Sequence, residues 1–160
     1  MNKTIPMEIM GELIKEKLEQ GGNVKFTPKG NSMLPMLRNN IDTVVLKKND
    51  GKLKKYDLPL YQRKDETYVL HRVVKVKPDG SYLMRGDNQL YTEQGITDED
   101  IVGVVTEFIK DGKTYTVKNP RYRAYCIWWV NTYSFRVIYK RTRRFLGRVK
   151  RRFFCKSDLR

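Results

Sequence analysis

Apolar residues near the N-terminus recur at the three- and four-residue steps of a helix. Pro6 stands where the first turn of a helix tolerates proline, and Gly21-Gly22 is a typical stop signal. The apolar positions in between are Met7, Met10, Leu13, Ile14 and Leu18. The pattern predicts a short amphipathic helix over about residues 6–20.

From residue 24 to 117 the pattern changes to short runs rich in β-branched and aromatic residues, separated by turn formers. The runs cover residues 24–26, 43–46, 68–76, 81–84, 101–109 and 113–117. Turn sequences stand at residues 49–51, 78–80 and 111–112. This series is typical of a coiled, mainly antiparallel β-structure, with hairpins at residues 78–80 and 111–112.

After Pro120, aromatic residues again follow helical steps, and a strongly basic run covers residues 136–152. The aromatic positions are Tyr122, Tyr125, Trp129 and Tyr133. The chain of 160 residues has the length of one domain with appendages. We therefore expect an N-terminal helix within residues 1–22, a β domain at residues 23–119 and a helical tail at residues 120–160.

Charge is concentrated in that tail, since residues 121–160 hold 13 of the 33 Lys and Arg residues and one of the 18 acidic residues. The net charge of +15 therefore belongs mainly to the tail and not to the β domain. Cys126 and Cys155 match no metal or disulfide spacing, and His71 is the only histidine. We expect no metal and no cofactor.

A candidate nucleophile lies in residues 30–35, Gly-Asn-Ser-Met-Leu-Pro. A serine held on a tight turn can present its hydroxyl and leave its own backbone amide free as an oxyanion donor. Ser32 needs a base, and His71 is the one histidine that could serve. Taken singly, each residue also fits a structural role, as a turn serine or as a histidine on a half-buried strand.

Strand alternation over residues 68–74 places His71 on the face opposite Arg72. The sequence Arg-Gly-Asp-Asn follows another predicted strand, at residues 85–88. Asp87 could stabilise a protonated imidazole as the acid of a triad does, with Asn88 as a possible supporting residue. Gly-Asp-Asn is also an ordinary turn sequence.

Ser-Met-x-Pro, then His-Arg-Val-Val, then Gly-Asp-Asn, in this order, resembles the type I signal peptidases. The likeness covers about residues 26–105 and is greatest to the endoplasmic-reticulum, archaeal and sporulation branch, in which His replaces the Lys base. It implies a serine endopeptidase with Ser32 as nucleophile, His71 as base and Asp87 as supporting acid. It also implies the coiled β fold shared with LexA-like peptidases, and cleavage of a signal or leader peptide from a precursor.

The chain departs from this family in two ways. Where the family usually has a second Asp after Gly-Asp-Asn, the nearest acid here is Glu93, which is therefore a further possible supporting residue. Family members normally carry a membrane-spanning helix, whereas the apolar stretch at residues 124–130 is far shorter than the about 20 residues that a span needs.

The tail instead has the composition of an interfacial segment, with aromatic rings at headgroup level and basic groups facing anionic lipid. The predicted membrane contacts are Trp128, Trp129, Arg136, Lys140, Arg141, Arg143 and Arg144. An alternative is a helix packed on the domain through its aromatic face. Nothing resembles a groove-reading module, so we do not expect nucleic acid as a partner.

These features predict a peptidase bound peripherally to the membrane, on the cytoplasmic face, that acts on a precursor peptide. Two alternatives stay open, a non-catalytic membrane-associated binding module of the same fold and a LexA-like autoproteolytic regulator. The second is disfavoured, because such regulators use a Lys base and cut at a small-residue bond, whereas the only alanine here is Ala124. The sequence does not predict the substrate's identity or the oligomeric state.

Overall fold

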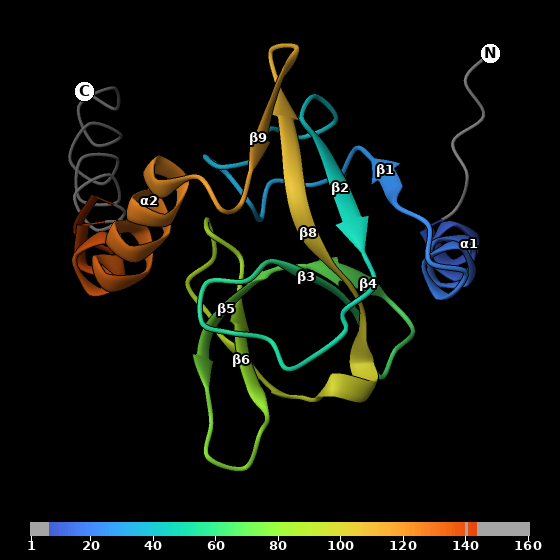
Figure 1. Cartoon of the computed structure of the whole chain (residues 1–160). Helices are drawn as coiled ribbons and strands as arrows, with labels where there is room; N and C mark the ends of the chain where they lie inside the picture. Colours follow the sequence, from blue (N-terminus) through green and yellow to red (C-terminus); the bar gives the residue numbers. More distant parts are fainter. Residues whose placement is uncertain (1–6, 140, 144–160) are drawn as a thin grey trace, which may run out of the picture.

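The computed structural model describes residues 7–139 and 141–143 as a mainly antiparallel β-structure with short helices (Figure 1). The predicted mainly β fold class is therefore confirmed. In chain order the elements are α1 (Met7–Glu19), β1 (Val24–Phe26), β2 (Thr43–Lys47), β3 (Pro59–Gln62), β4 (Tyr68–Leu70), β5 (Arg72–Val76), β6 (Tyr82–Arg85), β7 (Glu93–Ile96), a 3₁₀ turn (Asp98–Asp100), β8 (Ile101–Lys110), β9 (Lys113–Thr116) and α2 (Pro120–Asn131).

The strands form two sheets. The larger is six-stranded in the order β1-β2-β8-β3-β4, with β9 paired to β8, and the smaller has the order β5-β6-β7. Strand pairs β5/β6 and β8/β9 are the two hairpins that the turn sequences predict. In the second hairpin Asp111 and Gly112 both have positive φ, 48° and 74°, which suits a two-residue turn between twisted strands.

The structure differs from the predicted strands in one way that matters for the site. The run at residues 68–76 is divided at His71, with β4 in the larger sheet and β5 in the smaller one. The chain therefore passes from one sheet to the other at the only histidine. Strands β3 and β7 were not predicted from the sequence, and both supply residues around that histidine.

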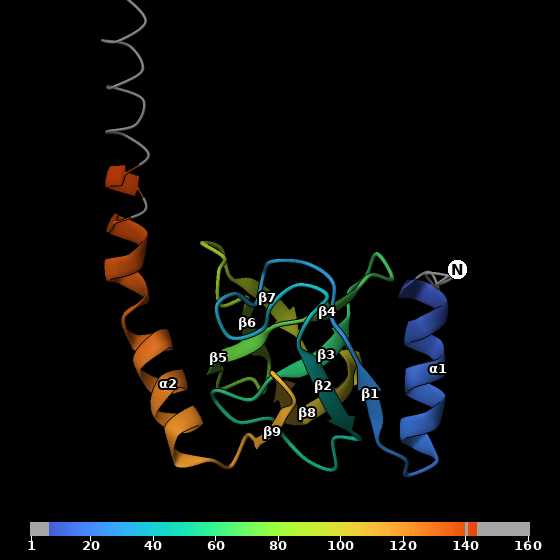
Figure 2. The ribbon, with the colours of Figure 1, turned by 90° about the horizontal axis from the view of Figure 1, so that it is seen from above.

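Buried apolar residues form two clusters. One lies under α1 and the larger sheet, includes Ile14 and Leu18, and extends to Met33, Met36 and Leu37 in the loop after β1. The other is centred on side chains of β3, β5 and β6. Leu13 is 53% exposed although its spacing matches that of the apolar face of α1. Helices α1 and α2 lie on opposite sides of the strands (Figure 2).

Helix α1 approaches β4 closely at Gly11, where a Cβ atom would lie 2.1 Å from Cε2 of Tyr68. We expect Gly11→Ala to displace the Tyr68 ring and lower the free energy of unfolding by about 1–3 kcal/mol, the usual cost of overpacking. Urea unfolding measures this change. Gly51→Ala is the matched control, because a Cβ at Gly51 meets nothing within 4 Å, and an equal loss in both variants would contradict the explanation.

Candidate active site

Ser32 lies in a turn between β1 and β2 whose neighbours are anchored in the core. Met33 and Leu37 are buried, and the Leu37 amide donates to the Met33 carbonyl at 2.9 Å. Ser32 itself is half-buried, and its backbone amide donates no hydrogen bond to any residue that the structure describes. The predicted oxyanion donor is therefore free to bind a substrate oxygen.

The loop after β6 supports this turn from a second side. The Asn88 amide donates to the Ser32 carbonyl at 2.8 Å, and Asn88 Nδ2 donates to the Asn31 carbonyl at 3.2 Å. A Cβ atom at Gly86 would lie 2.7 Å from the Ser32 carbonyl oxygen, so a larger residue would push the two segments apart. Asn88 is thus a supporting residue of the serine turn.

His71 occupies the junction between the sheets and is 2% exposed. Its Nδ1 lies 3.2 Å from Glu93 Oε1 and 3.2 Å from the Tyr61 hydroxyl. Because these partners surround Nδ1, the opposite ring nitrogen, Nε2, is the one left for proton transfer. This is the orientation that a triad base requires.

Glu93, at the start of β7, is held by β3 and the residue that follows it. The Tyr61 hydroxyl and Arg63 Nε each donate to Glu93 Oε2 at 2.8 Å, and Arg63 Nη2 bonds Glu93 Oε1. Tyr61 and Arg63 were missed by the sequence analysis, since β3 itself gave no clear strand pattern. The antiparallel pairing of β3 with β4 brings them beside His71.

Burial and neighbouring charges shift the pKa values of both His71 and Glu93. Burial lowers the pKa of His71 to about 4, although the neighbouring Glu93 charge opposes this shift. Desolvation would raise the pKa of Glu93, but hydrogen bonds from Arg63 and Tyr61 outweigh it and lower the pKa. Near neutral pH the imidazole is therefore neutral and able to accept a proton, and the carboxylate is ionised.

This pKa shift predicts a loss of stability in acid. The folded pKa of His71 is about 4, below the 6.5 of an ordinary histidine side chain, so the unfolded chain binds more protons between these values and stability falls as pH falls through this window. We expect His71 to account for about 2 kcal/mol of the stability lost between about pH 7 and 5. Urea unfolding at both pH values, compared with His71→Gln, measures it; equal losses in the two proteins would contradict the assignment.

Asp87 corrects the sequence prediction. Its carboxylate does not contact the imidazole but accepts from Arg72 Nε at 2.8 Å and from Arg72 Nη2 at 2.7 Å. Arg72 is fully buried and also donates to the Tyr56 carbonyl and the Tyr122 hydroxyl. Asp87 is therefore the partner of a buried arginine, although its charge also raises the pKa of His71, and Glu93 is the carboxylate that contacts the imidazole.

Ser32 and His71 line the same cavity, which has a volume of about 250 Å³. Its walls come from the serine turn, from β4 and from the loop after β6, and include Arg63, Tyr68, Val69, Gln89 and Tyr91. No hydrogen bond joins Ser32 to His71 among the described residues. The structure thus brings the predicted nucleophile and the predicted base to one cavity, without a hydrogen bond between them.

The tail prediction is partly corrected. The predicted aromatic face of α2 packs on the domain, where Tyr125 donates to Asp87 Oδ2 and Trp129 donates to the Asp87 carbonyl. Arg136 stacks on the Trp129 ring at 3.7 Å. Trp129 and Arg136 are therefore not free for membrane contact, because they are used in packing against the loop after β6.

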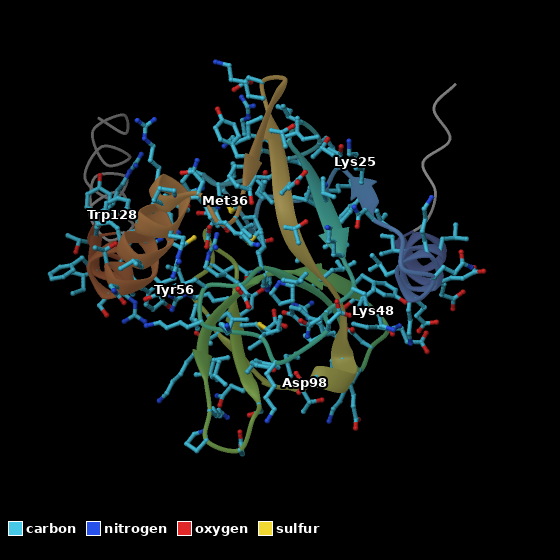
Figure 3. The ribbon with its side chains drawn as sticks, viewed as in Figure 1. Lys25, Met36, Lys48, Tyr56, Asp98 and Trp128 are labelled. Atoms are coloured by element: carbon cyan, nitrogen blue, oxygen red, sulfur yellow. The ribbon has the colours of Figure 1, made fainter. Side chains whose placement is uncertain are left out.

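Another side of this helix is exposed. Trp128 is 59% exposed and lies on the flank of α2 away from the strands (Figure 3). Other exposed apolar residues of this region are Ile127 in α2, and Phe135, Ile138 and Tyr139 after its end. Arg141 and Arg143 are exposed, whereas Lys140 and Arg144 lie outside the described residues.

Within the described ranges, no helix has the length and apolar character to cross a bilayer. In the same part of the chain, His, Cys, Asp and Glu side chains form no group suited to hold a metal ion.

No protein-family model, curated protein or solved structure matches this chain. The likeness to signal peptidases and to the LexA-like fold stays a prediction from the sequence motifs.

Proposed function

We propose that this chain is a serine endopeptidase of the signal peptidase kind, with Ser32 as nucleophile, His71 as general base and Glu93 as the acid that orients it. One observation carries the proposal. Ser32 and His71 come from distant parts of the chain and line one cavity, and a carboxylate lies against the histidine Nδ1. Mutual geometry of this kind, with a candidate nucleophile and base at one cavity and a carboxylate orienting the base, is what a catalytic site requires.

The reaction follows from these positions. Ser32 Oγ attacks the scissile carbonyl while His71 Nε2 takes its proton, and the Ser32 amide stabilises the oxyanion. Glu93 then faces an imidazolium and stabilises its charge. His71 returns the proton to the leaving amine, and water, activated by the same imidazole, hydrolyses the acyl-enzyme.

The substrate is proposed to bind as an extended peptide. Strand β4 is an edge of the larger sheet, and its residues Tyr68, Val69 and Leu70 line the cavity beside His71. A peptide that adds to this edge gains backbone hydrogen bonds and passes Ser32. A signal or leader peptide of a precursor protein is the substrate class that the sequence motifs favour.

The direct test is cleavage of a library of small-residue-rich peptides by the full chain, with anionic vesicles present. We expect cleavage by the native protein and none by Ser32→Ala, because the variant lacks the attacking oxygen. Equal cleavage by both proteins would show that a contaminating peptidase or another residue acts, and would overturn the assignment.

We also propose peripheral attachment to the cytoplasmic leaflet, whose anionic lipids suit a basic tail. Its support is the exposed apolar flank of α2 and the following helical residues, beside the exposed Arg141 and Arg143. Cleavage of the catalytic domain by protease added outside intact cells would contradict this side of the membrane.

Vesicle sedimentation tests the attachment surface. The double variant Phe135→Ser with Ile138→Ser should bind phosphatidylglycerol vesicles at least about tenfold more weakly than the native chain, because it loses two interfacial anchors. Ile41→Ser is the matched control, since Ile41 is 64% exposed but belongs to the β domain. Unchanged binding of the double variant would remove this flank from the membrane contact.

A non-catalytic binding module is the second candidate, and the unengaged Ser32 hydroxyl favours it. In that case the cavity and the β4 edge would hold a peptide without cutting it. Ser32→Ala would then bind peptide as the native chain does, and the native chain would release no products.

A further inference from the structure

Side chains of the C-terminal helical region donate hydrogen bonds to the loop between β6 and β7. Trp129 Nε1, on α2, donates to the Asp87 carbonyl at 2.9 Å, and Arg136 Nη1 donates to the same oxygen at 3.1 Å. The Tyr133 hydroxyl donates to the Leu90 carbonyl at 2.6 Å. Within the described part of the chain, these side chains are the only donors to the two carbonyls.

The side chains of Trp129, Tyr133 and Arg136 are held in place by stacking contacts. The Arg136 guanidinium lies 3.7 Å from the centre of the Trp129 ring, and Arg85 lies 3.4 Å from the centre of the Tyr133 ring. Arg85 is 8% exposed and is the last residue of β6, directly before the loop. Stacked, partly desolvated cations hold ring orientations more firmly than single exposed contacts do.

On its other side the same loop meets the candidate active site. The Asn88 amide donates to the Ser32 carbonyl at 2.8 Å, and Gln89 and Tyr91 line the cavity. The loop then ends at Glu93, whose carboxylate contacts His71. One short segment therefore links the nucleophile turn, the cavity wall and the carboxylate at the base.

We propose that Trp129, Tyr133 and Arg136 are positioning residues that hold residues 87–92 in place, and through them Ser32 and Glu93. The catalytic part of this inference rests on the proposed peptidase function, whereas the mechanical part does not. The helical tail then positions residues of the candidate active site and is also the proposed membrane anchor.

Hydrogen exchange of the full chain tests the mechanical part. In Tyr133→Phe the ring can still stack on Arg85 but the bond to Leu90 is lost, so amide exchange across residues 87–92, including Asn88, should rise about tenfold. Tyr115→Phe is the matched control, because it removes a hydroxyl from a residue of β9 that is 38% exposed and has no proposed role. Equal protection in native chain and Tyr133→Phe would overturn the inference, whether or not the chain is a peptidase.

Kinetics test the catalytic part, on peptides whose cleavage depends on Ser32. Well below the unfolding temperature, Tyr133→Phe should lower kcat about tenfold with a smaller change in KM, and Tyr115→Phe should change neither. A lower melting temperature with unchanged kcat would mean a purely structural contact and would refute the positioning role. Absence of any Ser32-dependent cleavage by the native chain would instead refute the proposed function, and the exchange result would still decide the mechanical part.

Discussion

Replacing His71 with alanine is expected to reduce kcat/KM for peptide cleavage by at least about 10³-fold. An unassisted serine hydroxyl is a poor nucleophile near neutral pH. The described lining of the cavity contains one histidine and no carboxylate, and Lys29 is its one lysine. Steady-state kinetics on the best library peptide measure the loss. Ser32→Ala should lose as much, and the double variant little more, because the two residues act as a unit.

Lys29→Ala is a suitable control for this series, since Lys29 is the one lysine that lines the same cavity and is exposed. It should keep most of the native activity. If His71→Ala kept more than a tenth of the activity while remaining folded, His71 would not be the base.

Asp87→Asn is expected to lower the free energy of unfolding by about 3–5 kcal/mol, the cost of leaving a buried charge without its partner. Arg72 has no exposed surface, and its guanidinium binds both Asp87 oxygens. A neutral amide cannot balance that charge. Urea unfolding followed by circular dichroism measures the effect.

Asp111→Asn is the matched control, because Asp111 pairs with Arg38 but its side chain is 75% exposed. Such surface pairs contribute about 0–1 kcal/mol. An Asp87→Asn protein as stable as the native chain but unable to cleave would restore Asp87 to the catalytic role that the sequence suggested. In contrast, Glu93→Gln should lower cleavage more than stability.

The local sequence pattern was sufficient to predict α1 and both hairpins. These elements depend on helical periodicity and on turn residues, which involve residues only a few positions apart. The pattern was insufficient for β3 and β7. Strand β3 begins at Pro59, and β7 contains Gly95 with a positive φ of 76°, so neither has strong strand propensity. Both strands form because neighbouring strands pair with them. Such pairing between distant parts of the chain cannot be predicted from the local sequence.

The same reasoning explains the candidate site. Ser32 and His71 could be named from the order of the motifs, whereas Glu93 could be named only as a possible supporting acid beside Asp87. Asp87 stands in a familiar motif, yet strand alternation had already put Arg72 opposite His71, and a buried arginine requires a carboxylate. Tyr61 and Arg63 reach Glu93 only through the packing of the two sheets.

The tail combines features of the two arrangements predicted for it, packing on the domain and contact with the membrane. The regular aromatic steps from Tyr122 to Tyr133 indicated a helix, and these rings pack inward. The exposed apolar residues, among them Trp128 and Phe135, lie out of step with that series. Which face of the helix is exposed to solvent depends on how the helix packs against the β domain.

The central claim is that Ser32 forms an acyl-enzyme with the help of His71. The most direct measurement is mass spectrometry of the full chain after acid quenching of its reaction with a nitrophenyl ester of a cleaved peptide. The account predicts one added acyl group on Ser32, with release of nitrophenolate, and no adduct in His71→Ala. An acyl group on another residue, or equal labelling of Ser32 in His71→Ala, would contradict it.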